Sequence, residues 1–337
     1  MRKTLTIGAA LLTVAGVTAI PMPRDAAAQE KYVMRAVTFL PVDRAKMKIK
    51  GVTLVERINK AAAEKHPGEL RINVVGGPEV IPSGDQPIAV RTGTVDMALT
   101  CASFYQGLVP VGDILLLSSV SLDDERRNGA LAYVRELHEK AGLYALGRMD
   151  GTRAPFFYLA TRKAVTKPAD LQGLRAGSIS LFAEAWARAL GMSFQVVPFG
   201  DTYTAMEHGV IDVYMNALDT QAAAGLTKLK GYTVVDHPAY VDNCLAIMNL
   251  TKWRSLPSHL QKLMQDVQQE VEVTAGSQMT EFNAAERKKM VDAGVKFVQF
   301  GPADAQKFVD TAYAAQCDKM LKIQPEIATK LKGMLSK

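Results

Sequence analysis

The fold is decided within residues 191–216, which read GMSFQVVPFGDTYTAMEHGVIDVYMN. Residues Phe194–Pro198 have the composition of a short strand. A helical run, Thr202–Glu207, follows and stops before Gly209, and a second strand-like run, Val210–Met215, comes next. A strand, a helix and a strand in quick succession are typical of an α/β layered fold.

The same rhythm continues on both sides of this stretch. Apolar residues at helical spacing predict a helix over 49–65 that ends at Pro67-Gly68. A helix that ends at glycine shortly before an apolar strand occurs at Gly93–Asp96 and again at Gly209–Asp212, which is consistent with two similar α/β lobes. The other predicted strands are Tyr32–Thr38, Leu70–Val75, Val95–Thr100, Phe156–Thr161 and Leu174–Ala176.

Residues 258–293 have a different character, with no proline and a single glycine, Gly276. Apolar residues recur at helical spacing at Leu260, Met264, Val267 and Val271. This pattern predicts one long helix, or two helices joined near Gly276. At 1.5 Å per residue such a helix would be about 54 Å long, so we expect it to lie across both lobes. A short strand over 297–300 and helices from Pro302 onward follow.

The first 28 residues have the pattern of a cleavable export signal. Arg2 and Lys3 precede an apolar run of about 15 residues, which is shorter than the ~20 residues that a membrane-spanning helix needs. Ala26–Ala28 fits the small-residue cleavage site, with cleavage after Ala28. We therefore expect a soluble protein that is secreted to the periplasm.

The charge pattern does not indicate a nucleic-acid partner. The chain has a formal net charge of +6 at pH 7, and its cations are scattered. Lys46, Lys48 and Lys50 form one dense group without interleaved aromatic residues, which we interpret as a solvated face. Asp123–Glu125 form a carboxylate cluster, which we interpret as acids at a helix N-terminus.

The sequence lacks the common motifs of catalysis and cofactor binding. It contains no H-E-x-x-H, no G-x-S-x-G and no glycine-rich nucleotide loop, so we expect no cofactor, no metal and no catalytic residues. Cys101, Cys244 and Cys317 are too few for a disulfide framework and lack the close spacing of a zinc site. We expect mainly buried free thiols, with one disulfide pair left open as an alternative.

Residues 150–216 also carry a series of motifs in a fixed order. The series consists of Asp-Gly-Thr-Arg (150–153), Lys-Pro-Ala-Asp-Leu-Gln-Gly-Leu (167–174), Gly191, Pro198–Ala205, Gly209, Asp212 and Asn216. With Val90–Asp96 and Trp253–Pro257, it resembles the solute-binding subunits of tripartite ATP-independent periplasmic (TRAP) transporters, of the dicarboxylate-binding type. The resemblance covers nearly the whole chain after the export signal.

This resemblance implies an α/β, two-lobe periplasmic binding-protein clamshell with a long helix spanning both lobes. Lobe I would comprise 29–150 plus about 243–283, and lobe II 151–242 plus about 284–337. The protein, which we expect to be a monomer and not an enzyme, would capture a small organic acid between the lobes and deliver it to the membrane subunits of a TRAP transporter. Two alternatives stay open, a ligand sensor for a membrane receptor and an enzyme built on the same scaffold.

The resemblance also implies candidate ligand contacts. The family places an arginine seven residues after the aspartate of the Asp-Leu-x-Gly step, where it grips the substrate carboxylate. Counting from Asp170 gives Gly177, so this arginine is absent. Arg153 matches a second ligand-contacting arginine, with an interlobe salt bridge as the alternative. Arg175 could replace the missing cation, although we favour a surface role for it.

Asn216 and Phe199 match an asparagine and a phenylalanine that contact the ligand in the family. Cys101 falls where relatives that bind polyhydroxylated acids carry an acidic residue, so a sugar acid is disfavoured. The remaining candidates are aromatic and would suit a flat or apolar ligand: Phe39, Tyr105, Tyr158, Tyr203 and Tyr214. We therefore expect an aromatic or monocarboxylic acid, with a neutral solute as the alternative because Gly177 would leave room and remove charge.

Overall fold

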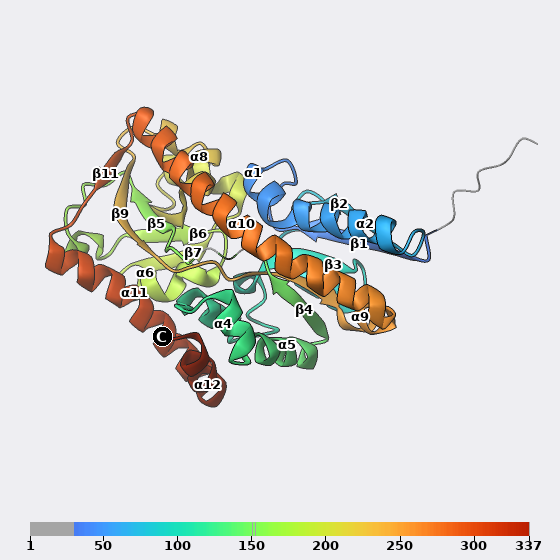
Figure 1. Cartoon of the computed structure of the whole chain (residues 1–337). Coiled ribbons are helices and arrows are strands. Elements are labelled where there is room, and N and C mark those ends of the chain that lie inside the picture. The colour runs from blue at the N-terminus through green and yellow to red at the C-terminus, as the bar shows by residue number, and fades with distance from the viewer. Residues whose placement is uncertain (1–29, 150, 152, 337) are drawn as a thin grey trace, which may run out of the picture.

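The computed structural model describes residues 30–149, 151 and 153–336 and shows two α/β halves side by side (Figure 1). The predicted export signal, Asp150 and Thr152 lie outside these residues. The strands are β1 (Tyr32–Thr38), β2 (Leu70–Gly76), β3 (Met97–Cys101), β4 (Leu143–Arg148), β5 (Phe157–Thr161), β6 (Arg175–Ser178), β7 (Ser193–Val196), β8 (Val213–Ala217), β9 (Thr233–Ala239), β10 (Cys244–Asn249) and β11 (Lys296–Val298).

The helices alternate with these strands over most of the described chain. They are α1 (Ala45–Met47), which continues through a π-helical turn (Lys48–Val52) into α2 (Thr53–Lys65), then α3 (Gln86–Thr92), α4 (Leu122–Arg127), α5 (Ala130–Lys140), α6 (Glu184–Ala189), α7 (Thr202–Glu207), α8 (Leu218–Ala223), α9 (Leu250–Ser255), α10 (Ser258–Asp292), α11 (Pro302–Ile323) and α12 (Pro325–Leu335). No helix in the described part of the chain combines the length and the apolar character that a membrane span requires.

The first sheet has the strand order β2-β1-β3-β10-β4, in which only β10 runs antiparallel to its neighbours. Successive strand residues point to opposite faces, so β3 buries Leu99 on one side and Ala98 on the other. The Leu99 face packs under α2 and the first half of α10, and the Ala98 face packs against α5 and α12. Both faces are therefore covered, as expected of an α/β sheet.

The second sheet has the strand order β11-β9-β5-β8-β6-β7. β5 lies between β8 and β9 and is antiparallel to both. One face packs against α6 and α11 around Trp186 and Phe308, and the other packs against α7 around Tyr214 and Met206. Each sheet thus has its own core on two sides.

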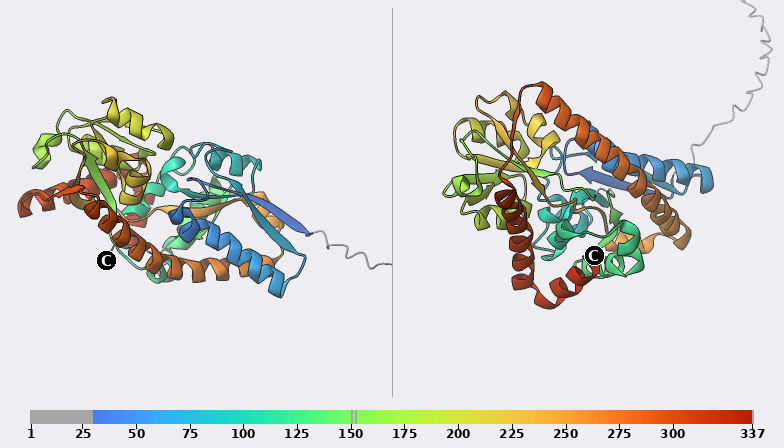
Figure 2. Two further views of the ribbon diagram at one scale, coloured as in Figure 1. Left: turned by 90° about the horizontal axis from the view of Figure 1, so that it is seen from above. Right: turned by 60° about the vertical axis from the view of Figure 1, so that its left-hand side comes forward.

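Two chain segments cross between the sheets, and they lie side by side. The amide of Met149 donates to the carbonyl of Cys244 at 3.0 Å, and the amide of Phe156 donates to the carbonyl of Tyr240 at 3.2 Å. The single helix α10 crosses from one half to the other beside them (Figure 2). It passes so close that a Cβ at Gly276 would lie 3.1 Å from the Cα of Gly151.

The α/β two-lobe fold and the long helix across both halves are confirmed. The pattern did not predict β4, β9 and β10. The predicted second lobe included all of 284–337, whereas α12 packs in the core of the first sheet, where Leu331 and Leu335 lie with Val37. Leu331 and Leu335 share this core with Leu137 of α5.

Cys101 and Cys244 form a disulfide, so the prediction of free thiols is wrong for these two residues. They stand opposite each other in the antiparallel pair of β3 and β10, although 143 positions separate them along the chain. Cys317 is a buried free thiol on α11, as expected. Linear spacing gave no sign of the pair because β10 returns to the first sheet from the second.

Replacing both Cys101 and Cys244 by serine should lower the free energy of unfolding by about 2–4 kcal/mol, because the cross-link restricts the unfolded chain over a long loop. Urea denaturation of the oxidised protein and of the variant measures the difference. Dithiothreitol should move the wild-type midpoint towards that of the variant and leave the variant unchanged. Equal midpoints for the two proteins without reductant would contradict the prediction.

Candidate functional site

A cavity of about 570 Å³ opens between the two sheets. Its walls come mainly from the loops that follow β1, β2 and β3 of the first sheet and β6 and β7 of the second. Ligands of open α/β sheets bind at this edge, beyond the carboxyl ends of the strands. The volume is typical of a site for a small molecule. Its apolar lining includes Phe39, Leu40, Phe104, Ile179, Val196 and Phe199.

A smaller recess of about 30 Å³ adjoins this cavity. Both spaces are lined by Phe39, Ser103, Phe104, Ile179 and Ser180. The rings of Phe157 and Phe182 also border the recess, together with polar side chains. These polar residues are Lys46, Asn216, Thr220, Asp242 and Asn243. Aromatic walls with a few convergent polar groups are the pattern of a small-molecule site.

The buried Lys46 lines this recess, and a second buried lysine, Lys50, pairs with Asp242, which also lines it. Lys46 and Lys50 are four positions apart in consecutive helical turns, which places them on one face. The Nζ of Lys46 lies 3.1 Å from Oδ1 of Asp219, and Lys50 forms an ion pair with Asp242. The interpretation of this lysine group as a solvated face is wrong for both residues, because carboxylates from distant segments pair with them.

Arg44 extends this cluster towards the larger cavity. Its guanidinium lies 3.9 Å from the carboxylate of Asp219 and 5.5 Å from the centre of the Phe199 ring. Arg44 and Lys46 therefore face the same carboxylate, that of Asp219, and these three groups together carry a formal charge of +1.

Asp113 lies behind the recess and is fully buried. Its carboxylate accepts hydrogen bonds from Ser103 at 2.5 Å, from Gln106 at 2.5 Å and from Asn243 at 2.7 Å. Burial raises the pKa of Asp113 to about 6, and these hydrogen bonds together with the charge of Lys319 offset the effect only in part. Ser103 and Asn243 also line the recess, so Asp113 fixes two of its polar groups.

A family model described as bacterial extracellular solute-binding protein, family 7, matches residues 45–322. The chain belongs to this family. A solute-binding protein of Roseobacter denitrificans is 30% identical over 151 residues, 42% of this chain and 45% of that protein. A monocarboxylate 2-oxoacid-binding periplasmic protein of a Nostoc species is 23% identical over 241 residues, 68% of this chain and 64% of that protein.

A solved structure has the same fold. It is an extracytoplasmic solute receptor of Bordetella pertussis that binds pyroglutamic acid, and it superposes with a TM-score of 0.77 at 17% identity. The superposition covers 90% of this chain and 99% of that chain. The matched segments span about half to two thirds of the two curated relatives. The family therefore gives the general role of solute binding and does not specify the ligand.

Four of the predicted contact residues line the cleft. Phe39 lines both spaces, Phe199 lines the larger cavity, and Cys101 and Asn216 line the recess. Cys101 contributes a disulfide sulfur rather than the thiol that we expected. The Oδ1 of Asn216 accepts the amide of Ala217 at 2.9 Å, which fixes the orientation of its side chain.

The predicted tyrosines lie elsewhere. Tyr105 is buried in the core of the first sheet, where its hydroxyl lies 3.1 Å from Nε2 of His138. Tyr214 is buried in the core of the second sheet, and Tyr203 points along α7 to Glu207, whose carboxylate lies 3.2 Å from the phenol oxygen. None of these three lines the cavity or the recess in the described structure. These tyrosines lie on elements whose ends reach the cleft, but their side chains point into a core or along the outside of a helix.

The Gly177 position is closed rather than open. A Cβ there would meet Ile211 and Val197 at 3.0 Å, so no room for a ligand exists beside it, contrary to our expectation. Arg175 is half-exposed and pairs with Asp212, with Nε 2.9 Å from the carboxylate. Its interpretation as a surface cation is confirmed. A cation for a ligand must therefore come from another segment.

Arg153 lies outside both the cavity and the recess. Its Nη2 is 3.3 Å from Oε1 of Glu125, a buried carboxylate that also pairs with Arg148. Asp123, Asp124 and Glu125 lie in the first turn of α4, as predicted, and Asp124 forms a capping box with Ser121, whereas Glu125 is also buried. The geometry favours the salt-bridge interpretation of Arg153.

Sequence reasoning missed most of the polar groups in the recess. Ser103, Asn243 and Thr220 belong to no recognised motif and meet only through the sheet pairings. Lys46 had a signal that was not used, since its spacing of four from Lys50 places both on one helical face.

Replacing Arg153 by alanine should lower the free energy of unfolding by about 1–3 kcal/mol, because a buried carboxylate loses one of its cations. Ligand affinity of the folded variant should stay within about twofold of the wild type. Chemical denaturation and calorimetric titration measure the two quantities. In the matched control Arg175→Ala, loss of an exposed pair should cost less than about 1 kcal/mol.

A variant of Arg153 with wild-type stability and at least tenfold weaker ligand binding would restore this residue as a ligand contact.

The titration of Asp113 should be visible in the stability of the protein. Because its pKa is about 6 in the folded state and 3.8 in the reference state, the folded protein holds this proton more tightly. Its stabilising contribution is complete below pH 4 and is lost as the pH rises through 6. The free energy of unfolding of Asp113→Asn minus that of the wild type should therefore increase between pH 4 and 7. A difference that does not change with pH would contradict this.

Proposed function

We propose that the protein captures a small organic acid with one carboxylate in the cleft and delivers it to the membrane subunits of a TRAP transporter. The observation that carries the proposal is the buried Lys46 at a recess with the amides of Asn216 and Asn243, next to an aromatic-walled cavity. The family and the fold supply the general role.

The charge around Lys46 supports an anionic ligand. In the cluster of Arg44, Lys46 and Asp219, the two cations carry one more charge than the carboxylate. Buried charge is costly unless a counter-charge lies close to it. A single ligand carboxylate would bring the cluster to neutrality, whereas a dicarboxylate would leave a surplus negative charge. The cluster therefore takes the role that the family arginine, absent at Gly177, has in relatives.

The walls support a flat or apolar body for the ligand. Phe39, Phe104, Phe157 and Phe199 present four aromatic rings to the two spaces. The relatives named above bind a 2-oxoacid monocarboxylate and pyroglutamic acid, which are small acids with one carboxylate. A polyhydroxylated acid would need several more hydrogen-bonding side chains than the larger cavity offers.

Delivery to a transporter rests on family membership and on the two-lobe architecture. In this arrangement the ligand lies between two halves that are joined by few segments. When the halves close around the ligand, the outer surface of the protein changes, and the membrane subunits would recognise the changed surface. The predicted export signal would place the protein in the periplasm, where such subunits are accessible.

Calorimetric titration should show binding of small monocarboxylates such as pyroglutamate, orotate or 2-oxoacids, and no binding of their neutral amides. Lys46→Met should weaken binding by about 1.5–3 kcal/mol, or roughly 10- to 150-fold in Kd, because a charge-assisted hydrogen bond is lost. The matched control is Lys48→Met, which changes an exposed lysine two positions away and should bind as the wild type does.

Lys46→Met also leaves Asp219 with fewer partners, so the double variant Lys46→Met/Asp219→Asn provides a version with the same formal charge as the wild type. It should fold normally and still bind weakly. Binding of neutral amides with equal affinity, or wild-type binding by a folded Lys46→Met variant, would contradict the proposal.

A further inference from the structure

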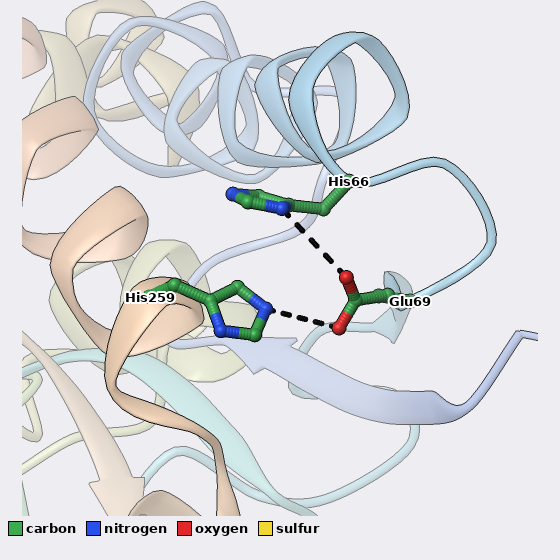
Figure 3. Close-up of side chains that lie close together, drawn as sticks. All are labelled: His66, Glu69 and His259. Carbon is green, nitrogen blue, oxygen red and sulfur yellow. Dashed lines mark hydrogen bonds and ion pairs between the residues drawn. The ribbon is translucent and has the colours of Figure 1, made fainter.

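Two histidines and a glutamate converge at a partly exposed site (Figure 3). His259 Nε2 lies 3.0 Å from one carboxylate oxygen of Glu69, and His66 Nδ1 lies 3.7 Å from the other. The two imidazole rings are 4.5 Å apart between centroids. One ligand atom from each residue lies within 4.8 Å of the other two. None of the three lines the cavity or the recess.

Three different elements hold these side chains. His66 is the C-cap residue directly after α2, Glu69 directly precedes β2, and His259 is the second residue of α10. The turn between His66 and Glu69 is closed by a hydrogen bond from the amide of Glu69 to the carbonyl of His66 at 3.1 Å, with Gly68 in the left-handed region at φ 75°. The turn therefore fixes the separation of His66 and Glu69.

Packing of α10 on α2 fixes the third ligand. Leu260, next to His259, is fully buried in the core that also contains Ile58 and Ala62 of α2. His259 is thus placed over the turn by the hydrophobic contact between the two helices rather than by a flexible loop. The side chains of His66 and Glu69 are about one third exposed, at 28% and 32%, so an ion from solution can reach them.

We propose that His66, Glu69 and His259 bind a divalent transition-metal ion of the zinc class. Imidazole nitrogens and a carboxylate oxygen are the donors that Zn²⁺, Cu²⁺ and Ni²⁺ accept, and two histidines with one glutamate form a known zinc ligand set. Zinc bonds of about 2.0–2.1 Å place tetrahedral ligand atoms roughly 3.4 Å apart. The two N···O distances, 3.0 and 3.7 Å, lie on either side of this value. Water would complete the coordination.

The ion would link the N-terminal end of α10 to the turn between α2 and β2, because its ligands come from both segments. Both partners belong to the first half of the molecule, at the end of α10 near α9 (Figure 1). Because α10 also reaches the second sheet, fixing its N-terminal end would restrict the position of this helix between the two halves. The ion should therefore raise the melting temperature and leave ligand binding in the cleft unchanged.

The test uses the chain expressed with its own N-terminal segment, purified without a histidine tag and stripped with EDTA. Titration with Co²⁺ should give visible d–d absorption that saturates at one ion per chain, and titration with Zn²⁺ should displace it. Excess Zn²⁺ should raise the melting temperature, since an ion that binds only the folded state stabilises it. His66→Asn and His259→Asn should each weaken binding at least about tenfold and abolish the temperature shift.

His208→Asn is the matched control, because His208 is an exposed histidine 3.8 Å from the carboxylate of Glu207 but outside the clusters that could hold a metal. This variant should bind Co²⁺ as the wild type does. If a histidine variant fails to fold, Glu69→Gln removes the shared oxygen ligand and should give the same loss. Absence of binding in the wild type, or wild-type binding by folded His66→Asn and His259→Asn, would overturn the proposal.

Discussion

The structure depends on a cluster of buried charges where the chain crosses from one sheet to the other. Arg148, at the end of β4, is 1% exposed, and its guanidinium lies 3.3 Å from Glu125 and donates to the carbonyl of Asp242. Its amide donates to Glu272 of α10 at 2.8 Å, and Glu272 also pairs with Arg126. The cluster therefore ties together β4, α4, the second crossing segment and α10. A buried ion that lacks a partner typically costs about 3–5 kcal/mol, so these groups hold one another in place.

Close backbone contacts complete this junction. A Cβ at Gly147 would lie 2.7 Å from Glu272, and one at Gly276 would lie 3.1 Å from Gly151, so α10 rests directly on β4 and on the first crossing segment. In the second crossing, Tyr240 has a φ of 63°, which is rare for a residue with a side chain. Its buried ring and a hydrogen bond to the carbonyl of Ala312 at 2.7 Å hold it there.

The same crossing also builds the recess that we propose as part of the ligand site. Asp242, Asn243 and Cys244 follow shortly after Tyr240 and line the recess. Asp242 holds Lys50, Asn243 donates to Asp113, and Cys244 is linked to Cys101. The segment that joins the halves thus positions the polar groups that a ligand would meet. This arrangement couples ligand contacts to the relative position of the halves, as a two-lobe binding protein requires.

The sequence by itself determined the α/β alternation, the strand Tyr32–Thr38, the long helix over 258–292 and the resemblance to a solute-binding family, because each is written in local periodicity or in motifs of contiguous residues. It also indicated Phe39, Phe199, Cys101 and Asn216 as cleft residues.

Only the tertiary structure decided the antiparallel entry of β10 into the first sheet, the disulfide, the burial of Lys46 and Lys50, and the pairing of Arg153 with Glu125. Each of these depends on a partner from a distant segment of the chain. Such long-range pairings are fixed by sheet order and by the packing of α10, and neither leaves a periodic signal near the residues concerned.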